Sequence, residues 1–140
     1  MKTLASKLSI AVCLFVCVAG FAQEVKTEVN PNAGVFSFET EEIDYGTIQQ
    51  NANGERTFTF TNTGKSPIII SQVKSSCGCT VPSYSKTPIL PGGKSEIKVK
   101  YATNRIGNFK KTITIVSNAS EATKIIRIKG NVLKPETATM

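Results

Sequence analysis

The 140-residue sequence contains no histidine and no tryptophan, and it has only four cysteines and two methionines. Without histidine, the chain lacks the side chain that most often acts as a general base or binds a metal ion. It also has no glycine-rich phosphate loop, no Gly-x-Ser-x-Gly turn and no Cys or His set with metal-ligand spacing. The sequence therefore predicts a single domain of ordinary size that is not an enzyme and holds neither a cofactor nor a metal ion.

The first 22 residues have the pattern of a secretory signal peptide. Lys2 and Lys7 are their only charges, and the apolar run 8–21 is too short to span a membrane comfortably. Ala22 and the glycine two positions before it supply the small side chains that a signal peptidase requires. We therefore expect cleavage between Ala22 and Gln23 and export to the periplasm or out of the cell.

Two other interpretations of this leader stay open. A lipoprotein would carry a small residue before its modified cysteine, whereas Cys13 and Cys17 each follow a valine. The apolar run would otherwise remain as an uncleaved anchor. Cleavage would leave 15 Lys and Arg residues against ten Asp and Glu residues, a net charge of +5, together with two cysteines and no transmembrane segment.

Short segments in which apolar and polar residues alternate follow the leader, and turn residues separate them. Phe58 and Phe60, for example, alternate with three threonines. This pattern predicts strands over 35–39, 42–48, 56–62, 68–73, 95–101, 109–117 and 123–132. Residues 75–90 contain two prolines and both remaining cysteines and look irregular. About seven or eight short strands predict an all-β fold, an antiparallel β-sandwich, with an oligonucleotide-binding type of barrel as the alternative.

The same pattern sets the expected boundaries and turns. Residues 23–34 are polar and are predicted to be flexible, the sandwich to span 35–133, and residues 134–140 to form a disordered tail. Asn53-Gly54 and Pro91-Gly92 are typical turn pairs in which the glycine takes a positive φ. Three consecutive isoleucines at 68–70 predict a central strand or one that is covered on both faces.

Five segments of the chain carry a distinctive pattern: 38–48, 58–67, 76–82, 89–93 and 113–118. The most specific motif among them is Ser-Cys-Gly-Cys-Thr at 76–80. In these segments the chain resembles the bacterial domain of unknown function 1573 family. One departure is Ile43, where the family usually has histidine. The resemblance covers about 36–132 and implies an immunoglobulin-like sandwich, related to domains of ciliary and centrosomal proteins, in an exported bacterial protein. It implies no activity.

Cys77 and Cys79 are the candidate site. In an extended strand, Cα atoms two residues apart are about 6.5 to 7 Å apart, at the limit for a disulfide, and Gly78 is expected to allow the bend that shortens this distance. A bridge closing so small a loop would stabilise the fold by only about 1.6 kcal/mol. We predict an intrachain disulfide. A structural bridge, a redox-active dithiol, a copper(I) site and pairing with another chain all stay open.

The charged residues form three groups with less specific meaning. Lys94, Lys98 and Lys100 share one strand face and Arg127 and Lys129 another, which fits either an anionic partner or a solvated outer face, and we favour the second. Four clustered carboxylates are expected to be solvated rather than to bind calcium: Glu39, Glu41, Glu42 and Asp44. No pattern of stacked aromatic residues indicates nucleic-acid binding.

Together these features predict an exported immunoglobulin-like binding module whose partner is another protein or a cell-envelope component. The alternative is a periplasmic protein that exchanges disulfides or handles copper(I) through Cys77 and Cys79.

Overall fold

The computed structural model describes residues 30–136, which contain eight strands and no helix. The predicted signal peptide, its cleavage point between Ala22 and Gln23, residues 23–29 and residues 137–140 lie outside the described part. The strands are β1 (Phe36–Phe38), β2 (Glu42–Gln49), β3 (Glu55–Asn62), β4 (Ile70–Ser75), β5 (Thr80–Tyr84), β6 (Lys94–Tyr101), β7 (Gly107–Ser117) and β8 (Thr123–Leu133). The predicted all-β fold is confirmed.

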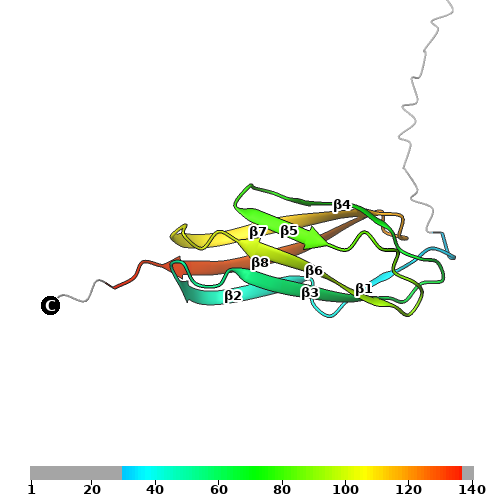
Figure 1. The fold of residues 1–140 in the computed structure, drawn as a ribbon, viewed down its shortest axis with the longest axis horizontal. Coiled ribbons are helices and arrows are strands. Elements are labelled where there is room, and N and C mark those ends of the chain that lie inside the picture. Colours follow the sequence, from blue (N-terminus) through cyan, green and yellow to red (C-terminus); the bar gives the residue numbers. More distant parts are fainter. Residues whose placement is uncertain (1–29, 137–140) are drawn as a thin grey trace, which may run out of the picture.

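The strands form two four-stranded sheets that pack face to face (Figure 1). One sheet has the order β1-β3-β6-β5, and all its neighbours are antiparallel. The other has the order β2-β8-β7-β4, in which β2 and β8 run parallel. Alternation of apolar and polar residues indicates which face of a strand is buried but not the direction of its neighbour, so the parallel pair was not predicted.

The inner faces of the two sheets make one hydrophobic core. Phe58 and Phe60 of β3 are completely buried, as the alternation predicts. The inward residues of β6, β7 and β8 are also buried as predicted: Ile97, Val99, Tyr101, Phe109, Ile113, Ile115, Ile126, Ile128 and Val132. Because every strand contributes one apolar face, two facing sheets bury all of these faces together.

Two local predictions were wrong. Residues 75–90 contain the strand β5, with Pro82 at its centre, and an edge strand tolerates proline because one of its sides has no partner. The isoleucine run does not form a central strand: β4 lies at a sheet edge, and Ile69 is 47% exposed between two buried isoleucines. Ile68 instead forms an isolated antiparallel bridge with Ile89.

Asn62 joins three segments at one end of the sandwich. Its side chain is completely buried, and its Oδ1 accepts hydrogen bonds from the N–H groups of Val35 (3.1 Å) and Gly64 (2.9 Å). Its Nδ2 donates to the carbonyls of Ser66 (2.8 Å) and Ile89 (2.9 Å). One amide therefore binds four backbone groups, two donors and two acceptors. Within residues 30–136 three of them have no other partner, whereas the Ile89 carbonyl also accepts from the Ile68 N–H.

Part of the segment predicted to be flexible, residues 30–34, is described. The Ala33 carbonyl accepts a hydrogen bond from Lys65 (3.2 Å), and the Gly34 carbonyl accepts one from Ser120 (2.8 Å). Both residues are buried. The sandwich therefore forms hydrogen bonds with residues that precede Val35, the predicted first residue of the sandwich.

An aromatic cluster closes the opposite end. The Tyr101 and Phe109 rings stack with centroids 3.8 Å apart, and Tyr45 packs edge-on against Phe109 at 5.2 Å. The Tyr45 hydroxyl donates to the Gly54 carbonyl at 2.7 Å, and the Arg56 guanidinium lies 4.3 Å from the Tyr45 ring centroid. Burial raises the pKa of Tyr45 to about 12, although the Arg56 charge opposes this change.

We expect this burial to make stability fall at alkaline pH. A tyrosine of the unfolded chain has a pKa of about 10, so the neutral Tyr45 stabilises the fold fully below that pH. The contribution is lost as pH rises from about 10 toward the folded-state pKa of about 12. Absorbance titration of the folded protein should show one of its three tyrosines ionising last, and Tyr45→Phe should remove that step. Ionisation of all three near pH 10 would contradict the assignment.

Candidate functional site

The Cys-Gly-Cys loop connects β4 of one sheet to β5 of the other (upper left in Figure 1). At its start, the Ser76 N–H donates to the Thr112 carbonyl (2.9 Å), and the Thr112 N–H donates to Ser76 Oγ (3.1 Å). At its end, the Ala102 N–H donates to the Cys79 carbonyl (2.8 Å). Hydrogen bonds to β7 and to the residue after β6 therefore fix both ends of the loop.

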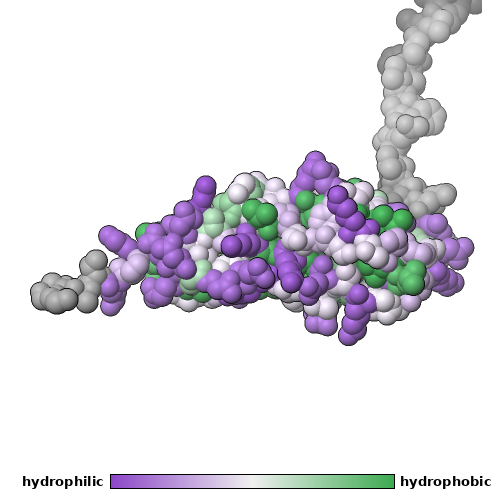
Figure 2. Space-filling view, in the orientation of Figure 1, coloured by the Kyte–Doolittle hydropathy of each residue, from purple (hydrophilic) through white to green (hydrophobic). Residues whose placement is uncertain are grey.

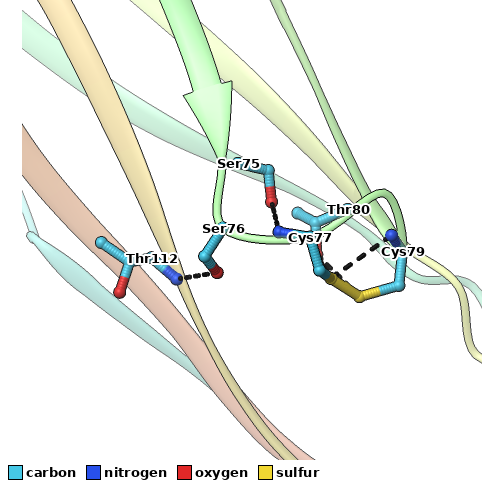
Figure 3. The surroundings of a disulfide bond; sticks show 6 residues. All are labelled: Ser75, Ser76, Cys77, Cys79, Thr80 and Thr112. Atoms are coloured by element: carbon cyan, nitrogen blue, oxygen red, sulfur yellow. Dashed lines mark hydrogen bonds between the residues drawn. A yellow bond between two sulfur atoms is a disulfide. The ribbon is translucent and has the colours of Figure 1, made fainter.

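The two cysteines are joined as a disulfide in the structure, with their Cα atoms 5.3 Å apart (Figure 3). This distance is shorter than that of an extended strand and lies within the range that disulfides span. The Cys77 N–H donates to Ser75 Oγ (3.3 Å), and the Cys79 N–H donates to Cys77 Sγ (3.3 Å). The backbone thus curls around the first sulfur.

The two sulfurs have different surroundings. Cys79 is 5% exposed and belongs to the hydrophobic core, whereas Cys77 is only partly buried and packs against that core. Thr80 is 3% exposed, and its hydroxyl lies 4.0 Å from Cys77 Sγ and 3.9 Å from Cys79 Sγ. Sequence reasoning found the cysteines because they are rare, but it missed Thr80, whose hydroxyl matters only because it is buried beside them.

Gly78 lies at the centre of the predicted bend, without a left-handed conformation. Its φ is not in the left-handed region, and a Cβ added to it would meet no heavy atom within 4 Å. The bend therefore does not depend on the conformational freedom of glycine.

A family model described as "Protein of unknown function (DUF1573)" matches residues 36–132. The chain belongs to the DUF1573 family. The match includes the Cys-Gly-Cys loop and all eight strands except the last residue of β8. The matched range is the same as the range predicted from the sequence resemblance. Comparison with curated proteins finds no match.

Several solved structures share the fold of this DUF1573 chain. A Porphyromonas gingivalis W83 protein of unknown function is 16% identical, with a TM-score of 0.64 over 74% of this chain and 50% of that one. The seventh PapD-like (ASH) domain of human CEP192 is 11% identical, with a TM-score of 0.63 over 76% of this chain and 91% of that domain. The chain thus spans half of the first protein and nearly all of the second. These likenesses confirm the immunoglobulin-like fold.

The charged residues of the DUF1573 chain pair with one another across the β2-β8 sheet. Lys129 Nζ lies 2.6 Å from Glu42 and 3.9 Å from Asp44, and Lys124 Nζ lies 2.6 Å from Glu41. The hydrogen bond between Lys129 and Glu42 raises the pKa of the lysine and lowers that of the glutamate. Three of the four carboxylates predicted to be solvated thus pair with lysines, and within residues 30–136 no three metal-binding side chains gather closely enough to hold an ion.

The lysines of β6 have fewer partners. Lys94, Lys98 and Lys100 are exposed and lie next to threonines and Glu55 of β3 in the register of the sheet. Lys98 forms an exposed ion pair with Glu96 at 3.4 Å, a type of contact that contributes little to stability. Arg127 lies on β8, in the other sheet, and is paired with Thr112 of β7.

A second surface feature surrounds the bridge between Ile68 and Ile89. Both of these side chains are buried, so the residues beside them in each strand point outward. These neighbours are apolar and exposed, and together we call them the bridge patch: Pro67, Ile69, Pro88 and Leu90. Figure 2 shows hydrophobic surface gathered toward the end of the molecule beyond β1 and β4. The described part of the chain contains no helix with the length and apolarity of a membrane span.

Proposed function

We propose that the protein is an exported binding module that holds another protein of the cell envelope through the bridge patch and catalyses no reaction. The leader over residues 1–22 supports export. The immunoglobulin-like fold supports binding by analogy, because a similar chain belongs to a complex of a chaperone with a tip adhesion subunit of the Csu pili of Acinetobacter baumannii. That chain is 13% identical, with a TM-score of 0.52 over 70% of this chain and 57% of that one.

The bridge patch is the observation that carries the proposal. Leu90 is 63% exposed and Ile69 is 47% exposed, and two prolines lie beside them. Apolar side chains that gather on one surface commonly mark a protein-binding site. A hollow lined by Pro88, Leu90 and Lys94 adjoins the patch. An apolar side chain of a partner could enter this hollow, and a neighbouring polar group of the partner could contact the Lys94 ammonium.

The backbone beneath the patch is held in place. Ile68 and Ile89 exchange two hydrogen bonds of 2.9 and 2.8 Å. Asn118 accepts a hydrogen bond from the Ile69 N–H (2.7 Å) and donates one to the Pro67 carbonyl (3.2 Å). A surface that is already rigid loses little conformational entropy when a partner binds, which favours affinity.

The sheet edges are poorly suited to pairing with a strand of another protein. β1 has only three residues, and Pro82 of β5 has no N–H to donate. The pairing of β2 is irregular beside Gly46, whose φ is +63°, and that of β4 is irregular after Ile70. Short strands, prolines and bulges are the features that prevent edge-to-edge association. The proposed contact is therefore through side chains of the patch.

Replacing Ile69 and Leu90 together with aspartate should abolish partner binding. Two charges at the centre of an apolar contact should lower affinity at least tenfold, because buried anchors carry most of the binding energy. The protein would be crosslinked in the cells that produce it, and the captured proteins would be compared between the wild type and the double variant.

Val81→Asp is the matched control, because Val81 is as exposed as Leu90 (63%) but lies on β5 outside the patch. We expect a partner that the wild type and Val81→Asp both capture and that the double variant loses. Capture of the same proteins by all three would exclude the patch as the binding surface, and turnover of a substrate by the purified protein would contradict the non-catalytic role.

A further inference from the structure

We infer that the Cys77–Cys79 disulfide exchanges with thiols of other molecules, that Cys77 is the sulfur they attack, and that Thr80 assists the departure of Cys79. The exchange is stoichiometric, with one disulfide per domain, so it is not catalytic turnover, and it is independent of the bridge patch. The inference rests on three features of the loop: the unequal exposure of its sulfurs, the groups that face them, and the small ring that the bridge closes.

Exposure selects the attacked atom. An incoming thiolate must approach a disulfide sulfur directly, and Cys79, 5% exposed within the core, offers little access. Cys77 is only partly buried. The loop lies at an end of the sandwich, between β4 and β5. A thiol can therefore reach Cys77 without unfolding the domain.

The reaction balances without a further oxidant. The thiolate of the partner attacks Cys77 Sγ and forms a mixed disulfide, while the Cys77–Cys79 bond breaks and its electron pair stays on Cys79 Sγ. The Cys79 thiolate then takes a proton from water. A second thiol of the partner can attack the mixed disulfide, which oxidises the partner to a disulfide and leaves Cys77 and Cys79 reduced. Alternatively, Cys79 attacks Cys77 again and restores the starting state.

The groups around the sulfurs favour both steps. A thiolate in an apolar site is costly unless a donor faces it, and the Thr80 hydroxyl lies 3.9 Å from Cys79 Sγ. Among residues 30–136 the Thr80 hydroxyl has no hydrogen-bond partner besides the two sulfurs, so its proton can turn toward the departing thiolate. The Cys79 N–H donates to Cys77 Sγ at 3.3 Å, so a donor also faces the attacked sulfur.

The bridge also contributes little to the fold. Closing a loop between residues two apart in the sequence removes little entropy from the unfolded chain. The hydrogen bonds of Ser76 with Thr112 and of the Cys79 carbonyl with the Ala102 N–H involve no sulfur atom. The domain can therefore lose and regain this bond while it stays folded.

Single-cysteine variants of the exported chain test the inference, with oxidised glutathione as the probe. Cys79→Ser keeps the accessible thiol and should form a mixed disulfide at Cys77. Cys77→Ser keeps the buried thiol and should react at least tenfold more slowly. In the wild type, Thr80→Val should slow reduction of the bridge by reduced glutathione severalfold, because valine keeps the shape and removes the donor. Mass spectrometry measures each product, and circular dichroism verifies the fold.

Equal reaction of the two single-cysteine variants, or no reaction of either, would overturn the inference. So would a wild-type bridge that stays oxidised in every ratio of reduced to oxidised glutathione, because that is the behaviour of a purely structural disulfide. If a variant does not fold, the wild type is treated with reduced glutathione and quenched with acid. Glutathione attached to Cys77 supports the inference, and glutathione attached only to Cys79 refutes it.

Discussion

Replacing Asn62 with leucine should lower the free energy of unfolding by about 4 kcal/mol, although the two side chains have the same branched arrangement of heavy atoms. The loss arises because leucine removes four hydrogen bonds and leaves three backbone groups without partners: the N–H groups of Val35 and Gly64 and the carbonyl of Ser66. The Ile89 carbonyl loses one of its two hydrogen bonds and keeps the one from the Ile68 N–H. An unsatisfied buried polar group costs about 1 to 3 kcal/mol, and two of these four bonds extend to segments 27 residues away. For a domain of this size we expect a decrease of about 20 °C in Tm.

Asn62→Asp separates the two halves of this network. Aspartate can still accept hydrogen bonds from Val35 and Gly64, but its carboxylate would face the carbonyls of Ser66 and Ile89. Burial beside these oxygens should raise its pKa above the unfolded value of about 4. The neutral acid is then the stabilising form, so this variant should be most stable below pH 4 and should weaken as pH rises.

Urea unfolding followed by circular dichroism measures both effects. Asn108→Leu is the matched control, because Asn108 is exposed on β7 and its side chain makes no hydrogen bond in the described structure. We expect its stability to stay within about 0.5 kcal/mol of the wild type. If Asn62→Leu were as stable as this control, the four bonds would not be holding the end of the sandwich.

Most of the fold could be predicted because a two-residue period carries strong information. Phe58 and Phe60 alternate with threonines, and only an extended strand places both on one face. β5 was missed because Pro82 reads as a strand breaker, and its acceptability depends on β5 lying at an edge. The role of Asn62 could not be predicted, since one asparagine at the end of a strand looks like any turn residue until its distant partners are known.

The candidate site was predicted in the same uneven way. The sequence indicates Cys77 and Cys79 because cysteine is rare in this chain. The predicted turn at Pro91-Gly92 is also present: Gly92 has a φ of +76°, and the Gly93 N–H donates to the Leu90 carbonyl at 2.8 Å. The bridge patch depends on the pairing of Ile68 with Ile89, which no local pattern reveals. Long-range pairing, and not residue type, creates that surface.

Replacing Gly54 with alanine should be the second most damaging change, at about 3 kcal/mol. The sequence suggests that this glycine is needed for a positive φ, but in the turn that role belongs to Asn51, with a φ of +64°. Gly54 is needed for another reason. A Cβ at this position would collide with the Tyr101 carbonyl oxygen and would lie 2.9 Å from Thr103 Cγ2. Backbone atoms cannot rotate away as a side chain can, so β3 and the end of β6 would have to separate.

That separation would also reach the aromatic cluster. The Gly54 carbonyl accepts hydrogen bonds from the Tyr45 hydroxyl (2.7 Å) and the Tyr101 N–H (3.0 Å), and both would lengthen. Gly78→Ala is the matched control, because a Cβ there meets nothing within 4 Å and φ is not left-handed. Thermal unfolding should show a large loss for Gly54→Ala and almost none for Gly78→Ala. Equal stability of the two variants would mean that β3 and β6 can move apart at no cost, contrary to the close contact at Gly54.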